Sequence, residues 1–329
     1  MFKLPKIITK IGTRNHTIYR PFTNKPVQAI QSARLITAIK TPFLPNGKID
    51  LKSFDYHASQ QVKHGVDGLI IGGTTGEGHL LSWDEHIMLI AHAKYTLGDK
   101  CIIIGNTGSN STQEALRATE QGFSVGMDAS LQINPYYGKT SENGLLKHFS
   151  QVMDFGPAII YNVPGRTSQD ISVEIIEKLS SHENFTGVKE CMGNTRIQQY
   201  TDKGIFTWSG NDDECHDARH NHGCNGVISV TSNIIPGLFR KMMDTPNPII
   251  NKKIEKLIQI LFIHPNPIGI NTVMMILGLC KPVFRLPYVE LEPELRNEAI
   301  NIINEIGIEH FVKNKNFYNY LDDKDFIYI

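Results

Sequence analysis

Short apolar runs alternate with longer amphipathic stretches along the chain, from residue 34 to about residue 236. The runs are rich in β-branched residues and are apolar without interruption, as in parallel strands that helices cover on both faces. The pattern predicts eight strands, at 34–42, 68–73, 101–108, 129–135, 157–164, 186–191, 206–212 and 226–233.

The stretches between the strands predict helices, and those at 82–98 and 111–122 have the clearest starts. Each begins with a serine, Ser82 or Ser111, and carries a glutamate three residues later. In this arrangement the serine hydroxyl accepts from a free backbone N–H, and the glutamate accepts from the serine's own N–H. The sequence therefore predicts a capping box at the start of both helices.

Eight strand–helix units in succession predict an α/β fold, a (β/α)8 TIM barrel at 34–236. A doubly wound open sheet is the alternative, but no G-x-G-x-x-G follows the first strand, which argues against a dinucleotide-binding sheet. Beyond about residue 236 we expect no further strands. Residues 251–263, 269–280 and 294–312 predict a three-helix appendix within a C-terminal helical domain at 237–329.

The start of the chain is basic. The first 49 residues contain no aspartate or glutamate, whereas lysine and arginine recur throughout. Residues 1–33 therefore form a basic leader that resembles an organellar transit segment. Serine is scarce in it, which is atypical of such segments, and a disordered cytosolic tail is the alternative reading.

The overall composition excludes several classes of protein. Lysine and arginine number 33, as do aspartate and glutamate, so no excess basic charge is available to neutralise nucleic-acid phosphates. No run of 18 apolar residues occurs, so we expect no transmembrane helix and no membrane partner. The five cysteines are scattered and form no C-x-x-C, which favours a reducing compartment.

Polar residues gather where the predicted strands end and their loops begin. In a (β/α)8 barrel this end carries the active site. Each residue alone could cap a helix, fill the core or cover a loop, but a purely structural reading explains their common location poorly. They are Thr74, Thr75 and Glu77 after the second strand, Tyr136 and Tyr137 after the fourth, Tyr161 and Arg166 at the fifth, Lys189 and Glu190 at the sixth, 209–213 at the seventh, and Ser229 and Thr231 at the eighth.

Lys189 lies within an apolar strand, although lysine is almost never fully buried without a partner. Burial lowers the pKa of an amine, and a shift of about three units corresponds to roughly 4 kcal/mol. A neutral amine forms Schiff bases with ketones. Pairing with Glu190 is the alternative, but adjacent strand residues point to opposite faces. Tyr161 could then transfer protons, if Thr75 holds its hydroxyl.

Six motifs together resemble the dihydrodipicolinate synthase (4-hydroxy-tetrahydrodipicolinate synthase) family, and its plant-type branch most of all. They are GGTTGEG, NPYYGKTSENG, YNVPGRTSQD, GVKECMGN, WSGNDDECHDAR and GVISVTSNIIPGL, and the likeness runs from about Arg34 to Phe326. The resemblance implies a lyase of lysine biosynthesis that condenses pyruvate with L-aspartate 4-semialdehyde, without a cofactor or a metal. It also implies the plastid stroma as the location, with the cytoplasm as the alternative.

The resemblance also implies roles for individual residues. Lys189 would form the Schiff base, and Tyr161 would relay protons through Thr75 to Tyr137, which in the family reaches into a neighbouring subunit's site. Arg166 would bind the carboxylate of the semialdehyde, a task suited to a bidentate guanidinium. The remaining substrate-binding positions are Thr74 and Thr75 for the pyruvate carboxylate, and Gly210 and Ile228 through their backbones.

A regulatory site is implied as well, because the family binds its inhibitor L-lysine at a dimer interface. The matching residues here are Gly78, His79, Trp83, His86, Asn110, Glu114 and Tyr136. His79 stands where plant-type sequences are expected to carry glutamine. The family further implies a homotetramer built from two tight dimers.

Three alternatives remain open at this stage. The segment CHDARHNHGC, at 215–224, holds enough cysteine and histidine for a zinc site, but its spacing fits no common pattern. Another pyruvate-dependent lyase, acting on a sialic acid or a keto sugar acid, would share the chemistry. A lysine-binding regulator without catalysis would share only the regulatory site, and the presence of Lys189, Tyr161 and Arg166 argues against it.

Overall fold

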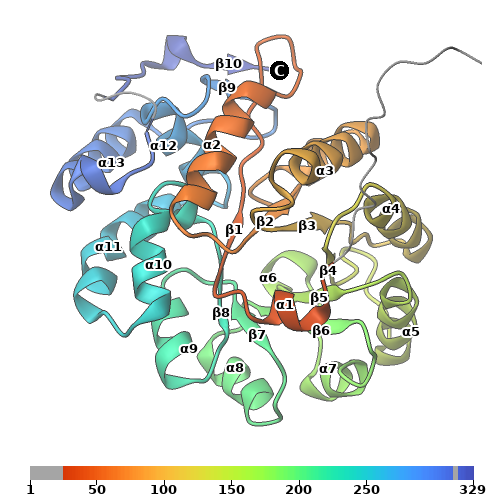
Figure 1. The fold of residues 1–329 in the computed structure, drawn as a ribbon. Helices are drawn as coiled ribbons and strands as arrows, with labels where there is room; N and C mark the ends of the chain where they lie inside the picture. Colours follow the sequence, from red (N-terminus) through yellow and green to blue (C-terminus); the bar gives the residue numbers. More distant parts are fainter. Residues whose placement is uncertain (1–24, 314–317) are drawn as a thin grey trace, which may run out of the picture.

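The computed structural model describes residues 25–313 and 318–329, and its centre is a closed barrel of eight parallel strands (Figure 1). Each strand pairs with the next along the chain, and β8 pairs with β1. This confirms the predicted barrel and all eight strands, and it contradicts the open-sheet alternative. The strands are β1 Leu35–Ala38, β2 Gly68–Ile71, β3 Ile102–Asn106, β4 Ala129–Ile133, β5 Ala158–Asn162, β6 Phe185–Glu190, β7 Thr207–Ser209 and β8 Gly226–Ser229.

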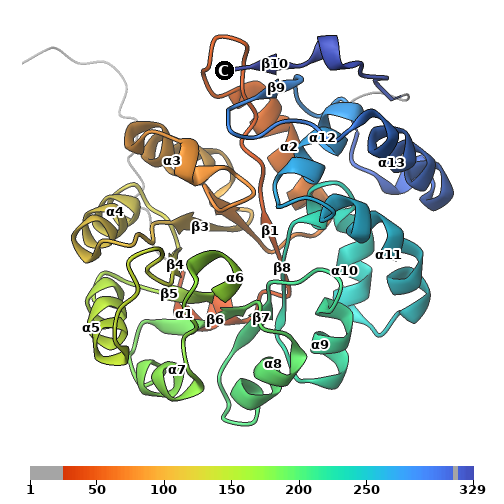
Figure 2. The same cartoon turned by 180° about the vertical axis from the view of Figure 1, so that it is seen from behind.

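Helices form a ring outside the barrel (Figures 1 and 2). The strands are buried along their whole length apart from the last residues of β3 and β4, because side chains fill the interior and the helices cover the outside. The helices of the ring are α2 Leu51–Lys63, α3 Trp83–Leu97, α4 Thr112–Ser124, α5 Glu142–Met153, α7 Val173–Leu179, α8 Asn194–Thr201, α9 Cys215–Asn221 and α10 Pro236–Asp244, and a single turn, α6 Pro164–Thr167, follows β5.

Of the two predicted capping boxes, the one at Ser82 forms in full and the one at Ser111 forms only in part. Ser82 accepts from the backbone N–H of Glu85 at 3.2 Å, and the Glu85 carboxylate accepts from the Ser82 N–H at 2.9 Å, so the first box is confirmed. Ser111 likewise accepts from the N–H of Glu114 at 3.4 Å. The Glu114 carboxylate, however, accepts from the Ser109 hydroxyl at 2.9 Å, so the reciprocal half of the second box is wrong.

The amino-terminal end of the barrel is closed by α1, Val27–Gln31, which lies across it in Figure 1. The indole of Trp208, wholly buried in the barrel, donates to the Ala33 carbonyl at 2.8 Å. Gln31 donates to the Thr186 carbonyl at 3.1 Å. Residues 1–24 of the expected leader lie outside the described residues.

The carboxyl-terminal segment contains the three expected helices, α11 Pro248–Leu261, α12 Ile268–Ile276 and α13 Pro293–Ile306. The expectation that strands end near residue 236 is wrong, because β9 Val283–Phe284 and β10 Ile327–Tyr328 form a parallel pair. Strands of two residues, joined across a long separation in the chain, leave no periodic signal. Both lie beside the loop after β1 (Figure 2). Arg285, which follows β9, donates to the Gly47 carbonyl of that loop at 2.6 Å.

The loop after β2 is fixed from within the protein by Glu77. Its carboxylate is wholly buried and accepts from the Lys40 ammonium, which is equally buried, and from the Asn271 amide at 2.7 Å. Glu77 has a φ of +55°, a conformation that residues other than glycine rarely adopt. The loop is therefore anchored on one side to Lys40, in the loop after β1, and on the other to α12.

Candidate active site

A cavity of about 400 Å³ opens at the carboxyl end of the barrel strands. Six residues expected to act on substrate line it: Lys189, Tyr161, Thr74, Thr75, Arg166 and Gly210. They come from β5, β6 and the loops after β2, β5 and β7, so the fold alone brings them together from distant parts of the chain. The rest of the lining includes Ala38, Ile70, Leu131, Val163, Cys191, Asn211, Phe262, Pro265 and Asn266.

Lys189 lies at the centre of this cavity. It is only 7% exposed, and its register partners are Tyr161 on β5 and Trp208 on β7. Its Nζ lies 4.3 Å from the centroid of the Tyr161 ring. Burial lowers the pKa of Lys189 below its usual value, although Cys191 and Asp212 favour the charged form. The amine is therefore held where its neutral form is favoured relative to a lysine in water.

Glu190 points away from Lys189, as the strand geometry predicts. Its carboxylate accepts from the Asn162 amide at 3.1 Å and from the backbone N–H groups of Cys191 and Met192 at 2.8 Å. Glu190 is fully buried outside the barrel interior, and burial raises its pKa. Pairing between Lys189 and Glu190, the alternative reading of the strand, is therefore wrong.

The phenol of Tyr161 is buried beside the amine, and burial raises its pKa well above the usual value. The neighbouring side chains of Cys191 and Thr74 also influence this pKa, Cys191 by raising it and Thr74 by lowering it. The Thr75 hydroxyl accepts from the Asn266 amide at 3.1 Å, and the described residues form no hydrogen bond between Tyr161 and Thr75. A relay from Tyr161 through Thr75 thus stays a prediction.

Arg166 projects from the single turn α6 toward the cavity. Its Nη2 donates to the backbone carbonyl of Asn266 at 3.0 Å, and no other residue within 25–313 and 318–329 accepts from the remaining guanidinium donors, which can therefore bind a ligand. Gly210 is required by close packing, because a Cβ there would lie 2.3 Å from the Cys191 sulfur. Ile228 is 1% exposed on β8, next to Ile36, and is not part of the cavity lining.

Tyr137 lies apart from the cavity in this single chain. Its side chain is 92% exposed, and its φ of +67° is unusual for a bulky residue. Exposure of a large aromatic side chain on a strained backbone suggests a functional constraint at this position. Its expected insertion into a neighbouring subunit remains a prediction.

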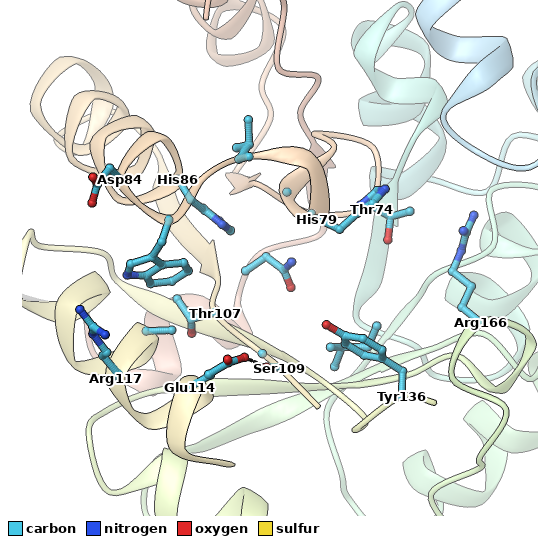
Figure 3. Close-up of a pocket in the computed structure, with 18 of the residues that line it drawn as sticks. Thr74, His79, Asp84, His86, Thr107, Ser109, Glu114, Arg117, Tyr136 and Arg166 are labelled. Carbon is cyan, nitrogen blue, oxygen red and sulfur yellow. Dashed lines mark hydrogen bonds between the residues drawn. The ribbon is translucent and has the colours of Figure 1, made fainter. Parts of the chain in front are cut away.

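A second cavity, of about 640 Å³, adjoins the first between α3, α4 and the loop after β4 (Figure 3). Six of the seven expected regulatory residues line it: Gly78, His79, Trp83, His86, Glu114 and Tyr136. Asn110, the seventh, is not part of the lining. Thr74 and Arg166 line both cavities, so the two spaces share a wall.

Some polar groups of the second cavity have hydrogen-bond partners within the protein. The indole N–H of Trp83 donates to the Gln121 amide oxygen, and the Tyr288 hydroxyl and His79 Nε2 lie 2.9 Å apart. Burial lowers the pKa of His86 to about 4, so this histidine is neutral at pH 7. Its Nε2 is buried and has no hydrogen-bond partner among the described residues.

Sequence reasoning missed the residues that reach these cavities from the helical extension. Phe262, Pro265 and Asn266 line the first cavity, and Tyr288 lines the second. The sequence predicts no helix or strand between the three expected helices, at 264–268 and 281–293, and no function for these segments. The polar Asn266 between two prolines was the available signal, but a sequence does not show that this break returns to the mouth of the barrel.

In the segment 215–224, the candidate zinc site, three side chains form hydrogen bonds with backbone carbonyls. The Cys215 thiol donates to the Asp212 carbonyl at 3.2 Å, and the Cys224 thiol donates to the Thr207 carbonyl at 3.2 Å. His220 contacts the Met242 carbonyl at 2.7 Å. Within 25–313 and 318–329, no three cysteine, histidine or acidic side chains are grouped as a metal would require, and no helix there is long and apolar enough to cross a membrane.

The fold and the cavity define a (β/α)8-barrel enzyme with a buried lysine at the carboxyl end of the sixth strand. The chain belongs to the dihydrodipicolinate synthetase family, whose model matches residues 31–306. It is 56% identical over 301 residues to the Arabidopsis thaliana protein "4-hydroxy-tetrahydrodipicolinate synthase 1, chloroplastic". The aligned region covers 91% of this chain and 82% of that protein. The expected family is therefore confirmed.

Two solved structures are similar along nearly their whole length. One is the chloride-inhibited dihydrodipicolinate synthase of Acinetobacter baumannii complexed with pyruvate, with 32% identity and a TM-score of 0.80. The other is the enzyme of Cyanidioschyzon merolae with lysine bound, with 29% identity and a TM-score of 0.80. Each match covers 84% of this chain and 99% of the other chain.

These relatives establish the general function and location of the protein. It is a lyase of lysine biosynthesis through diaminopimelate, and its homologues support 4-hydroxy-tetrahydrodipicolinate synthase function. The names of its plant relatives, from Arabidopsis thaliana, Triticum aestivum and Glycine max, are chloroplastic and confirm the plastid location. The readings as a non-catalytic regulator and as a cytoplasmic protein are thereby set aside.

Proposed function

We propose that the protein condenses pyruvate with L-aspartate 4-semialdehyde through a Schiff base on Lys189, and that L-lysine inhibits it. One observation carries the proposal: the Lys189 amine is buried in a closed barrel, 4.3 Å from the Tyr161 ring, in a cavity that Arg166 also lines. The pyruvate complex of the Acinetobacter baumannii enzyme supports pyruvate as the first substrate.

The chemistry begins with attack of the neutral amine on the C2 carbonyl of pyruvate, which releases one water and forms an imine. Loss of a methyl proton gives an enamine, whose C3 attacks the aldehyde carbon of the second substrate. The amino group of that substrate then attacks C2 and displaces the lysine nitrogen, which closes the ring and restores the enzyme. The net change joins the two substrates with loss of one water.

The proton transfers fall to Tyr161, which is the phenol nearest the amine. In the full relay Thr75 passes the proton to Tyr137, supplied by a neighbouring subunit of a homotetramer built from two tight dimers. Thr74 and Thr75 hold the pyruvate carboxylate, and Arg166 holds the carboxylate of the semialdehyde. Gly210 and Ile228 contribute through their backbone groups.

L-Lysine occupies the second cavity. Glu114 binds the α-ammonium group and Asn110 the carboxylate, with Gly78, His79, Trp83, His86 and Tyr136 around them. Thr74 and Arg166 line both cavities, so a ligand that shifts either side chain alters the shape of both. This shared wall couples inhibitor binding to the catalytic cavity. The lysine complex of the Cyanidioschyzon merolae enzyme supports this ligand.

The test is an assay of the purified protein with both substrates, in which the cyclic product is measured with and without L-lysine. The proposal predicts product formation that needs both substrates and that falls as lysine is added. An active enzyme that accepts pyruvate with a sugar-derived aldehyde, but not with the semialdehyde, would contradict the proposed substrate. Full activity at saturating lysine would contradict the proposed regulation.

A further inference from the structure

Asn266 is the most buried of the three residues by which the helical extension lines the catalytic cavity. It belongs to the connection between α11 and α12, is 8% exposed, and lines the same space as Lys189. This connection lies outside the barrel's own strand–helix units, so the extension supplies part of the active-site wall.

The contacts of Asn266 join two groups that belong to different barrel loops. Its amide Nδ2 donates to the Thr75 hydroxyl at 3.1 Å, and its backbone carbonyl accepts from the Arg166 guanidinium at 3.0 Å. A threonine hydroxyl has one proton and two lone pairs. Because Asn266 occupies one lone pair, the Thr75 hydroxyl keeps its proton available for another acceptor.

The second polar atom of the side chain is unused. Asn266 Oδ1 is buried and has no hydrogen-bond partner among the described residues. A buried amide oxygen without a partner is unfavourable, and such atoms in native proteins commonly meet a water or a ligand. Because Oδ1 is shielded from solvent, the amide acts on the site through its Nδ2 contact with Thr75.

We propose that Asn266 is a positioning residue of this enzyme: its amide orients the Thr75 hydroxyl, and its backbone carbonyl fixes the Arg166 guanidinium. The inference rests on the proposed function, because it assigns Asn266 a role in the same reaction.

A double-mutant cycle tests whether Asn266 acts through Thr75. Asn266→Ala should lower kcat by about tenfold or more, while the KM for the semialdehyde stays within about twofold because the backbone carbonyl that holds Arg166 remains. In a Thr75→Val background, which removes the hydroxyl at similar volume, the same change should lower kcat by less than about threefold. Asn266→Asp, which keeps the volume but donates no hydrogen bond when ionised, should lose kcat as Asn266→Ala does.

Asn271 provides a matched control. It is also buried, donates its amide to a residue of the same loop, Glu77, and has an unpartnered Oδ1, but it does not line the catalytic cavity. Asn271→Ala should lower the melting temperature while kcat and KM stay within about twofold. If Asn266→Ala does not fold, Asn266→Ser enters the same cycle, and its kcat should fall in the wild-type background alone.

The outcomes separate this inference from the function on which it rests. Equal losses of kcat in both backgrounds, or unchanged kinetics in a folded Asn266→Ala protein, would overturn the positioning role. In either case, trapping of pyruvate on wild-type Lys189 with borohydride leaves the proposed function standing. Absence of that adduct from the wild-type protein would overturn both.

Discussion

Lys189 and Tyr161 are direct register partners on neighbouring parallel strands, and the amine nitrogen lies 4.3 Å from the centroid of the phenol ring. Since paired residues of adjacent strands point to the same side of a barrel, the pairing places an amine and a proton donor in one desolvated space. Their relation is set by strand register, which makes it more rigid than a contact between loops.

Lys189→Ala should remove nearly all turnover and leave the fold intact, because the substituted side chain carries the proposed nucleophile. The measurement is kcat for the condensation, with circular dichroism as the check on folding. Lys203→Ala, at a surface lysine paired with Glu177, is the control and should keep its rate. A Lys189→Ala enzyme with wild-type turnover would exclude the mechanism.

Tyr137→Phe should lower kcat by about tenfold to a hundredfold without loss of the fold, since it removes only a hydroxyl that is proposed to end the proton relay. The matched control is Tyr95→Phe, at a tyrosine that is 83% exposed and outside both cavities. Equal turnover of the Tyr137→Phe and wild-type enzymes would remove Tyr137 from the relay.

Trp83→Arg should raise the lysine concentration needed for half-maximal inhibition by tenfold or more. The substitution removes an aromatic wall of the second cavity and adds a positive charge beside a cationic ligand. Inhibition curves of the mutant and wild-type enzymes provide the measurement. If the two curves coincide, the regulatory site lies elsewhere.

Lys40→Met should destabilise the protein by about 3–5 kcal/mol, because it leaves the buried carboxylate of Glu77 without its charged partner. Denaturant unfolding measures the change. Adding Glu77→Gln should restore part of the loss by removing the unpaired charge. A Lys40→Met protein as stable as the wild type would show that this pair does not hold the loop.

Stability should fall as the pH decreases from about 6.5 toward 4. Burial lowers the pKa of His57, His86 and His148 to about 4, while unfolded histidine keeps a value near 6.5. Between these values the unfolded chain binds more protons than the native protein, so acid favours unfolding by about 2 kcal/mol per histidine at pH 5. A free energy of unfolding that is equal at pH 7 and pH 5 would contradict this.

The barrel was predictable because its strands are short, β-branched and continuously apolar, and strand ends in this fold mark the functional face. That logic led to Lys189, Tyr161 and Arg166, which the structure brings together in one cavity. Glu77 shows the limit of the rule that strand ends mark the functional face. It is a polar residue at a strand end, but it is buried and anchors its loop.

What the sequence did not reveal depends on contacts between distant segments. Asn266 meets Thr75 across 191 positions of the chain, and no local pattern marks such an encounter. The pair β9 and β10 is too short to carry a period, and its register is set only when the carboxyl terminus returns to the barrel. Both belong to the extension, whose packing is decided by tertiary contacts.

The most direct test of the account is borohydride reduction of the protein in the presence of pyruvate, followed by mass spectrometry of its peptides. The account predicts an added mass of about 72 Da, that of a reduced pyruvate adduct, on Lys189 and on no other lysine. The Lys189→Ala protein should gain no such mass. An unmodified Lys189 in the treated wild-type enzyme, or an adduct on a different lysine, would contradict the central claim.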